Sequence, residues 1–373
     1  MTPRHHKPPP NKTKKLLSSS RSALKHSVRI VHHVCCVAGA HTLIDDTRSA
    51  GAPNTLGSAI DRLDTPALFD WLVDALSYQG ISDRAAFAYI QKHGSVTWLE
   101  IEYRLSKRPS CPKLKSYWHF HECNYVKSRR SCSQPEHYSR CPLPKHRLRN
   151  GRLNQTAYSL FLFLRDVADS DLVNWIDGQL SSAILIGKAK PIPAMRESLL
   201  GPLRYIYGVA DKVLGMAFAM ILLAAPDART HWHETGGSMI AIDTLVHKFL
   251  YRTGILARCN AKHPYGPRCY DKNGCAEIIE KVAVAINAKE FNKTFPSYFP
   301  RFVQYAIWRF CAQEGLGICN GNRIDDRKRC QIKWCRLFFR CARHPISPLT
   351  KKIFKNRLNQ GPLEALRLKW RLA

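Results

Sequence analysis

The sequence has few acidic residues and no long apolar run. Its 373 residues include 58 Lys and Arg but only 28 Asp and Glu, which gives a formal net charge of +30. The longest apolar run is Val213–Ala225, whereas a membrane-spanning helix needs about 20 residues. This run therefore predicts a buried core helix and no membrane function. A chain this basic favours a polyanionic partner, above all nucleic acid.

Strand patterns are nearly absent, and no internal repeat is visible. Apolar residues instead recur at helical spacing, as in the segments 154–165, 171–185 and 195–206. Hydrophobic residues make up 45% of the chain, which excludes a wholly disordered polybasic protein. The sequence therefore predicts a mainly α fold with a substantial core.

The composition divides the chain into five parts. We expect residues 1–54, which are rich in Pro, Ser, Lys and Arg, to form a disordered basic arm, with a signal or transit segment as the alternative. The first helices of a helical domain then occupy 55–104, a Cys/His-rich insertion 105–150, the remainder of that domain 151–345, and a basic tail 346–373.

The chain has fourteen cysteines, most of them in groups. Grouped thiols without a convincing secretion signal favour metal binding over disulfides. Near the end of the chain, intervals of ten, four and five residues separate Cys319, Cys330, Cys335 and Cys341. Four thiolates of this kind suit either an iron–sulfur cluster or zinc.

Two further groups are candidates for structural zinc. The insertion contains four cysteines that no standard finger spacing fits, so loosely paired or free thiols remain the alternative: Cys111, Cys123, Cys132 and Cys141. The other group has three cysteines with a histidine nearby: Cys259, Cys269, Cys275 and His263.

Three short segments carry the chemistry that we expect. The segment YGVADK, Tyr207–Lys212, lies between two helical patterns and predicts a turn whose backbone N–H groups bind phosphate, or else an ordinary helix–helix turn. Asp243 begins a helix among apolar residues, either as a simple N-cap or as a partly desolvated carboxylate. Gln79, in LSYQGISD, follows a helix and could equally be a solvent-facing turn residue.

In their order along the chain, Gln79, then YGVADK, then Asp243, the three segments resemble those of the helix-hairpin-helix DNA glycosylase superfamily, in particular its endonuclease III-like branch. YGVADK stands where that family has LPGVGxK, and residues 241–254, AIDTLVHKFLYRTG, resemble AVDTHVxRVxxRxG. The resemblance covers roughly residues 60–345, with long insertions. It implies a two-lobed helical fold with a C-terminal cysteine cluster loop and, here, an added Cys/His-rich insertion.

The resemblance also implies site residues and a cofactor. Asp243 matches the carboxylate that supports cleavage of the N-glycosidic bond, and Lys212 the lysine nucleophile of the bifunctional members, which are also AP lyases. Gly208, Val209 and Ala210 match the hairpin that holds a DNA phosphate, and Gln79 the residue that fills the gap left by a flipped nucleotide. The four terminal cysteines match a loop that holds a [4Fe–4S] cluster, with zinc as the alternative.

Several positions depart from the family's pattern. Tyr207 replaces a proline, and Ala210 replaces a glycine, so we expect strain if Ala210 needs a positive φ. Leu245 replaces a histidine, and the interval from Lys212 to Asp243 is long, so we expect 226–237 to loop out, with His231–Glu234 on the surface.

We therefore expect a DNA repair glycosylase that binds double-stranded DNA with a damaged or mismatched base. It is expected to act as a monomer and to be cytoplasmic and nucleoid-associated, unless the N-terminal arm targets it to an organelle. The alternatives are a non-catalytic DNA- or RNA-binding protein on the same scaffold and a basic zinc protein that binds RNA or scaffolds a complex.

Overall fold

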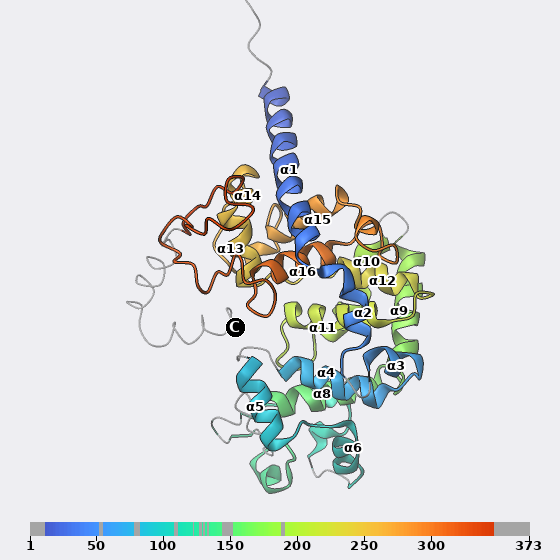
Figure 1. Ribbon diagram of the computed structural model, residues 1–373. Helices are drawn as coiled ribbons and strands as arrows, with labels where there is room; N and C mark the ends of the chain where they lie inside the picture. Colours follow the sequence, from blue (N-terminus) through green and yellow to red (C-terminus); the bar gives the residue numbers. More distant parts are fainter. Residues whose placement is uncertain are drawn as a thin grey trace, which may run out of the picture. The chain divides into compact units, whose positions relative to one another are not determined.

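The structure, a computed structural model, is mainly helical, as the sequence predicts (Figure 1). It describes residues 12–51, 55–77, 83–107, 111–121, 123–126, 129, 131–132, 134–143, 152–187 and 191–346. Within these ranges the sole β pairing is an isolated bridge between Val126 and Ser131. The chain divides into two compact units, which we describe separately.

The central unit comprises residues 41–241 and 294–296. Its helices are α2 (Leu43–Arg48), α3 (Leu56–Asp61), α4 (Thr65–Ser77), α5 (Asp83–His93), α6 (Trp98–Ser106), α7 (Tyr117–Phe120), α8 (Arg152–Asp166), α9 (Leu172–Ile186), α10 (Pro191–Leu203), α11 (Asp211–Ala224) and α12 (Thr230–Ser238). The predicted apolar core helix is α11, which α2, α3, α4, α10 and α12 surround. Leu214, Phe218 and Leu222 on α11 are almost fully buried, which confirms this prediction.

The segment before Asp243 is helical, so the prediction that 226–237 loops out is wrong. This segment forms α12, in which Trp232 is buried and its Nε1–H donates to Asp177 at 2.6 Å. Gly236 lets α12 lie close to α11, since a Cβ there would be 2.8 Å from the Leu222 Cβ. A buried glycine and an indole that binds a carboxylate give no apolar repeat, and for this reason the sequence pattern did not reveal the helix.

The insertion packs into the core of the central unit. Phe120 and Tyr125 are almost fully buried, and its loops are bound to α8, where the Gln155 amide donates to the Tyr125 carbonyl at 2.7 Å. The Asp166 carboxylate at the end of α8 accepts from the Tyr117 backbone N–H at 2.7 Å. The insertion is therefore fastened to a core helix by polar contacts as well as by buried aromatic rings.

The terminal unit is made of residues 1–40, 242–293 and 297–373, of which the structure describes 12–40, 242–293 and 297–346. Its helices are α1 (Lys12–Val37), α13 (Thr244–Arg252), α14 (Ile255–Arg258), α15 (Cys275–Val284) and α16 (Pro300–Cys311). Helix α16 packs against α1, α13 and α15. The unit thus joins the two ends of the described chain around one helix (Figure 1).

Helix α1 replaces most of the disordered arm that the composition predicts for 1–54. Its residues Ile30, Val31 and Val34 are almost completely buried, and the Arg309 guanidinium of α16 donates to the Ala38 carbonyl at 2.9 Å. The buried positions recur at helical spacing. Between them stand Ser, His and Arg residues, which lowered the mean hydropathy and disguised the apolar stripe.

Among the described residues, no single helix is long and apolar enough to cross a membrane. The helical segments 21–37 and 40–48, which are bent relative to each other, would together be long and apolar enough by length and composition only.

Candidate functional site

Asp243 is the N-cap of α13, and its carboxylate accepts a hydrogen bond from the Val246 N–H at 2.8 Å. The residue is half-buried, and its backbone is extended, as a cap requires. The Ile242 N–H just before it donates to the Tyr270 hydroxyl at 2.8 Å. The start of α13 is therefore fixed from two sides, by its own cap and by a neighbouring tyrosine.

A buried cation lies in the electrostatic surroundings of Asp243. Arg301, on α16, is only 7% exposed, and its guanidinium donates to the Gln304 side chain at 2.7 Å. Burial lowers the pKa of Arg301 to about 10, and the neighbouring Tyr305, Tyr270 and Asp243 act in the opposite direction. The half-buried carboxylate thus has a positive charge near it inside the same unit.

The predicted hairpin is a turn between α10 and α11. Gly208 takes the left-handed conformation with φ +73°, and the backbone of Tyr207 is held on α8 by the Thr156 and Ser159 hydroxyls, at 2.8 and 3.1 Å. Ala210 is the N-cap residue of α11 with φ −86°. The expected strain at Ala210 is therefore absent, because Gly208 alone carries the positive φ.

Lys212 lies in the first turn of α11 and is half-buried. It belongs to the central unit, whereas Asp243 belongs to the terminal unit. Gln79 lies outside the described residues, so its role stays a prediction.

The four terminal cysteines line one cavity of the terminal unit. The cysteines are Cys319, Cys330, Cys335 and Cys341. Apolar side chains of α13, α16 and the loop itself also line the cavity: Phe249, Phe310, Leu337 and Phe338. Backbone N–H groups two residues further along donate to two of the sulfurs, from Leu337 to Cys335 and from Arg343 to Cys341, the latter at 3.3 Å. Such donors stabilise thiolates, which are the metal-binding form of cysteine.

Cys311 is an additional thiol beside this group. It is fully buried at the end of α16 and hydrogen-bonds Cys319, which lowers the pKa of Cys319, while burial raises the pKa of Cys311. Within this pair, Cys319 is therefore the thiol that ionises first.

The cysteine loop is fastened to α13. The Lys248 ammonium lies 2.8 Å from the Asp326 carboxylate and donates to the Gly321 carbonyl at 2.9 Å. The Arg252 guanidinium, which is 1% exposed, binds the same Asp326 carboxylate. One helix thus carries Asp243 at its start and the cysteine loop along its second half.

The four cysteines of the insertion also come together in space. Cys111 and Cys123 are buried, and Cys132 and Cys141 are half-buried. Burial first, and then the charges of the other three thiols, raise the pKa of Cys141 to about 11. The same pattern of backbone donors recurs, from Tyr125 to Cys123, from Gln134 to Cys132 at 3.4 Å, and from Leu143 to Cys141. The thiols therefore form a single group, although their spacing fits no standard finger.

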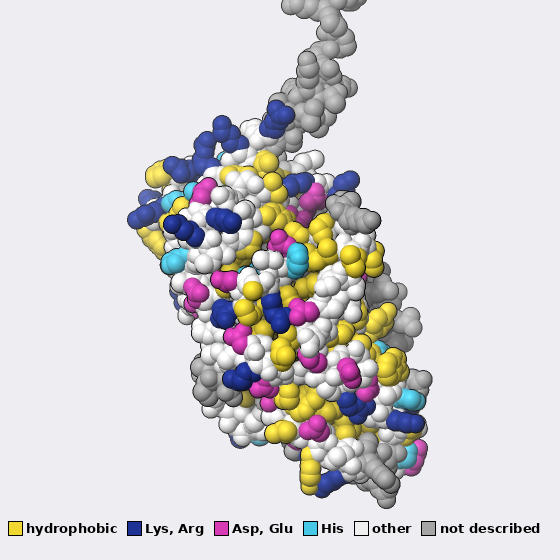
Figure 2. Space-filling view, turned by 90° about the vertical axis from the view of Figure 1, so that its right-hand side faces the viewer, with side chains coloured by type: hydrophobic (Ala, Val, Ile, Leu, Met, Phe, Trp, Pro, Cys, Tyr) yellow, Lys and Arg dark blue, Asp and Glu magenta, His cyan; other side chains and the backbone are white. Residues whose placement is uncertain are grey.

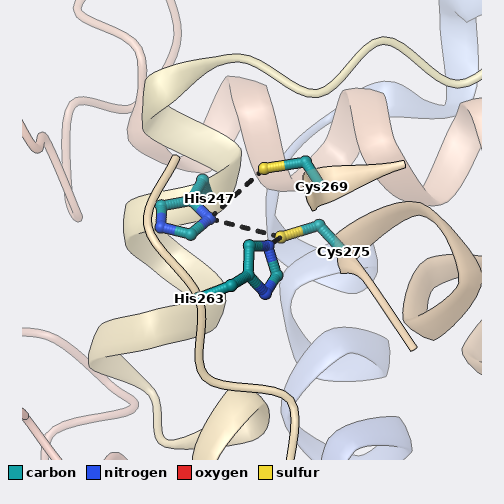
Figure 3. Close-up of side chains that lie close together, drawn as sticks. All are labelled: His247, His263, Cys269 and Cys275. Carbon is teal, nitrogen blue, oxygen red and sulfur yellow. Dashed lines mark hydrogen bonds between the residues drawn. The ribbon is translucent and has the colours of Figure 1, made fainter. Parts of the chain in front are cut away.

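A third group is the most compact: His247, His263, Cys269 and Cys275 (Figure 3). All four side chains are buried, and their ligand atoms lie within 4.8 Å of one another, close enough to hold a metal ion. The His247 Nδ1 lies 3.3 Å from the Cys275 sulfur and 3.6 Å from the Cys269 sulfur, and the His263 Nε2 lies 3.4 Å from the Cys275 sulfur.

The sequence predicted three members of this group and misassigned one position. Cys259 is outside it, because its sulfur contacts the Ser27 hydroxyl of α1 at 3.9 Å. His247 was missed because it lies within helix α13, sixteen residues before His263 and so outside the local cluster of cysteines. The available signal was a second histidine on the buried face of a helix that precedes the two cysteines.

The Cys269 thiol is the acidic member of the group. A hydrogen bond from Cys275, together with His247 and the Gly266 backbone, lowers the pKa of Cys269 to about 4. The pKa of Cys275 is raised, first by the same hydrogen bond and then by burial. Within this pair, Cys269 is therefore the thiol that ionises first.

Gly254, where α13 ends, offers a test of how tightly the cysteine loop packs. It has φ +83°, and a Cβ there would lie 2.8 Å from the Ala342 Cβ in the cysteine loop. We expect Gly254→Ala to lower the free energy of unfolding by about 1–3 kcal/mol, from the backbone conformation alone. Chemical denaturation measures this.

The matched control is Gly178→Ala on α9, where a Cβ would meet no atom within 4 Å. That change should stabilise the protein by up to about 1 kcal/mol, as expected for Gly in a helix interior. Equal unfolding curves for the two variants would contradict both the cost of the left-handed backbone and the close packing of the cysteine loop at Gly254.

Comparison of the chain with family models, with curated proteins and with solved structures finds no match. Its function is therefore argued from the side chains themselves.

Proposed function

We propose that the chain is a DNA N-glycosylase that excises a damaged base, with Asp243 as the catalytic carboxylate. The observation that carries this proposal is the placement of α13, which starts at the half-buried Asp243 and binds the basic cysteine loop through Lys248 and Arg252. The turn before α11, with Gly208 at a positive φ, is the second element in the order found in helix-hairpin-helix glycosylases. The likeness to that superfamily rests on these residues.

The role of Asp243 follows from the chemistry of base loss. As the N-glycosidic bond breaks, the electron pair leaves with the base and the sugar becomes oxocarbenium-like. A nearby carboxylate stabilises that positive charge, most effectively where water is excluded. Half-burial and the fixed cap keep the Asp243 carboxylate in one orientation, so little reorganisation is needed during the reaction.

DNA binding is attributed to charge and to exposed aromatic rings on the cysteine loop. Residues 319–343 contain eight Lys or Arg and only two Asp. Trp334 and Phe339 on the same loop are 68% and 95% exposed. Basic side chains attract phosphate, and aromatic rings stack on bases, so this combination is typical of nucleic-acid surfaces. On the face drawn in Figure 2, Lys and Arg gather at the upper end of the view, with acidic side chains interspersed lower down.

The loop's four cysteines are proposed to hold a [4Fe–4S] cluster. In a four-thiolate zinc site the sulfurs would lie about 3.8 Å apart, given Zn–S bonds of about 2.3 Å. Among the described residues these four sulfurs do not form a group within 4.8 Å of one another, unlike the His/Cys group. In a cubane each thiolate binds a different iron, so the sulfurs stand further apart.

The charges around this cavity support the same cofactor. Arg252 and Arg343 line it, and both have buried guanidinium N–H groups with no hydrogen-bond partner within the described structure. Four thiolates around a cluster carry a net negative charge, which such N–H groups stabilise. The role of the cluster would be structural, because it would hold the loop on α13. The chain's own residues would contact and act on DNA.

Lys212 supplies a test of the second reaction. Its neutral amine attacks C1′ of the sugar and displaces the base. The C1′–O4′ bond of the sugar ring then breaks, O4′ takes up a proton, and the Schiff base that precedes strand cleavage forms at C1′. We expect borohydride to trap a covalent protein–DNA adduct, and Lys212→Ala to abolish it. Gel electrophoresis of the trapped product measures this.

The control variant is Lys289→Ala, which removes an exposed lysine of the terminal unit. It should leave trapping unchanged. An intact protein that excises the base and yields no adduct would refute the lyase step and leave a monofunctional glycosylase.

A further inference from the structure

We propose that His247, His263, Cys269 and Cys275 bind one Zn²⁺, and that this ion fixes the start of α13. Because Asp243 is the N-cap of α13, the ion would be a positioning device for the carboxylate. This last step rests on the proposed function, whereas metal binding and its effect on α13 do not. The likeness to glycosylases does not supply this site, and the sequence supplied only three of its four ligands.

The separations of the donor atoms fit tetrahedral zinc. With Zn–S bonds of about 2.3 Å and Zn–N bonds of about 2.0 Å, a nitrogen and a sulfur on the same ion lie about 3.5 Å apart. The three nitrogen–sulfur distances in the group, 3.3, 3.4 and 3.6 Å, agree with this value. Two thiols and two imidazoles exclude Mg²⁺ and Ca²⁺, which require oxygen ligands.

The histidine His263 is held in the tautomer that a metal requires. Its Nδ1 lies 2.6 Å from the Ala261 carbonyl oxygen, which can only accept. Nδ1 therefore carries the proton, and the lone pair of Nε2 points toward the Cys275 sulfur at the centre of the group (Figure 3). A second partner that orients the imidazole in this way is a regular feature of zinc sites.

The backbone between the two cysteines is shaped to bring them together. At Gly274, the N-cap of α15, a Cβ would lie 2.5 to 2.8 Å from the carbonyl oxygens of Arg268, Cys269 and Asp271. Only glycine fits this turn, which places Cys275 at the first position of α15. The free N–H groups there favour a thiolate.

The group reaches the start of α13 by two routes. His247 lies one helical turn after Asp243, so a ligand bond to it holds the first turn of α13. Tyr270 directly follows Cys269, and its hydroxyl accepts the N–H of Ile242, the residue before Asp243. An ion bound to His247 and Cys269 therefore fixes the backbone on both sides of the carboxylate.

Metal analysis of the full chain tests the first part of the proposal. We expect Cys269→Ser to contain about one zinc fewer per chain than the unmodified protein, with its iron content unchanged. Cys259→Ser is the matched control, a neighbouring half-buried cysteine that contacts Ser27, and it should keep all of its zinc. Equal zinc content in the two variants, or two free thiols at Cys269 and Cys275 in the unmodified protein, would overturn the proposal.

A second pair of variants covers the case in which Cys269→Ser does not fold. His263→Cys keeps four ligands and should retain the zinc, whereas His263→Ala should lose it. Replacement of zinc by Co²⁺ should then give charge-transfer bands of two thiolates in the unmodified protein and of three in His263→Cys. Identical spectra for these two proteins would place the metal elsewhere.

Hydrogen exchange tests the link to Asp243 without any assay of activity. Removal of the zinc, or loss of it in His263→Ala, should speed exchange of the amides of Ile242 and Val246, which are hydrogen-bonded in the structure. Unchanged exchange after loss of zinc would refute the positioning role. Zinc binding and exchange as expected, in a protein that excises no base, would contradict only the proposed function.

Discussion

Replacing Asp243 with Asn will lower the rate of base excision by at least about 100-fold while leaving DNA affinity unchanged. The Asn amide is neutral, so it cannot stabilise the positive charge that develops on the sugar. Its oxygen can still accept the Val246 N–H, so the cap of α13 and the stability of the fold are kept. Single-turnover excision on duplexes that each carry one lesion, together with a binding titration, measures the two effects separately.

Asp171→Asn is the matched control, because Asp171 caps α9 in the same way, with its carboxylate 3.0 Å from the Asn174 N–H. That variant should excise at the unmodified rate. Full turnover in Asp243→Asn would mean that a residue other than Asp243 is the catalytic group. If the unmodified protein excises no lesion, the chain is a binding protein and not an enzyme.

Replacing Cys335 with Ser will remove the iron–sulfur cluster and destabilise the terminal unit. The unmodified protein should be brown, with iron and inorganic sulfide, and the variant should be colourless. Metal binding of this kind contributes directly to folding, so the midpoint of thermal unfolding should fall as well. Visible absorption, iron analysis and calorimetry measure these changes.

The control is Cys36→Ser, which removes an exposed cysteine from α1 of the same unit. It should keep both the colour and the stability. A colourless unmodified protein with zinc in place of iron at this loop would contradict the cluster assignment, and the two arginines that line the cavity would then need another partner.

The helical architecture was predictable wherever one face of a helix is plainly apolar. Helix α13 begins after Asp243, as the sequence predicts, because Leu245, Val246 and Phe249 repeat at helical spacing and Asp243 caps the start. Helix α1 was not predictable in this way. Its stripe is interrupted by buried Ser27 and flanked by basic residues, so its contacts with α16 had to be seen in the structure.

The metal groups were predictable in part. The four terminal cysteines and the four cysteines of the insertion were found because they are closely spaced along the sequence. In the structure the side chains of each group lie near one another. The His/Cys group was found only in part, because His247 comes from a helix and the other three ligands from a following loop and helix start. No local spacing encodes that approach, which depends on how α13 and α15 pack against α16.

The division of the chain also has a consequence for synthesis on the ribosome. The central unit is built almost entirely from one continuous stretch, 41–241, whereas α1 must wait for α15 and α16 before it can bury Ile30 and Val34. At about 5–20 residues per second, the interval between α1 and α16 lasts about 15–50 s. During that time the apolar stripe of α1 lacks the helices that bury it, and the proposed metal ligands of the terminal unit, from His247 onward, are still to be synthesised.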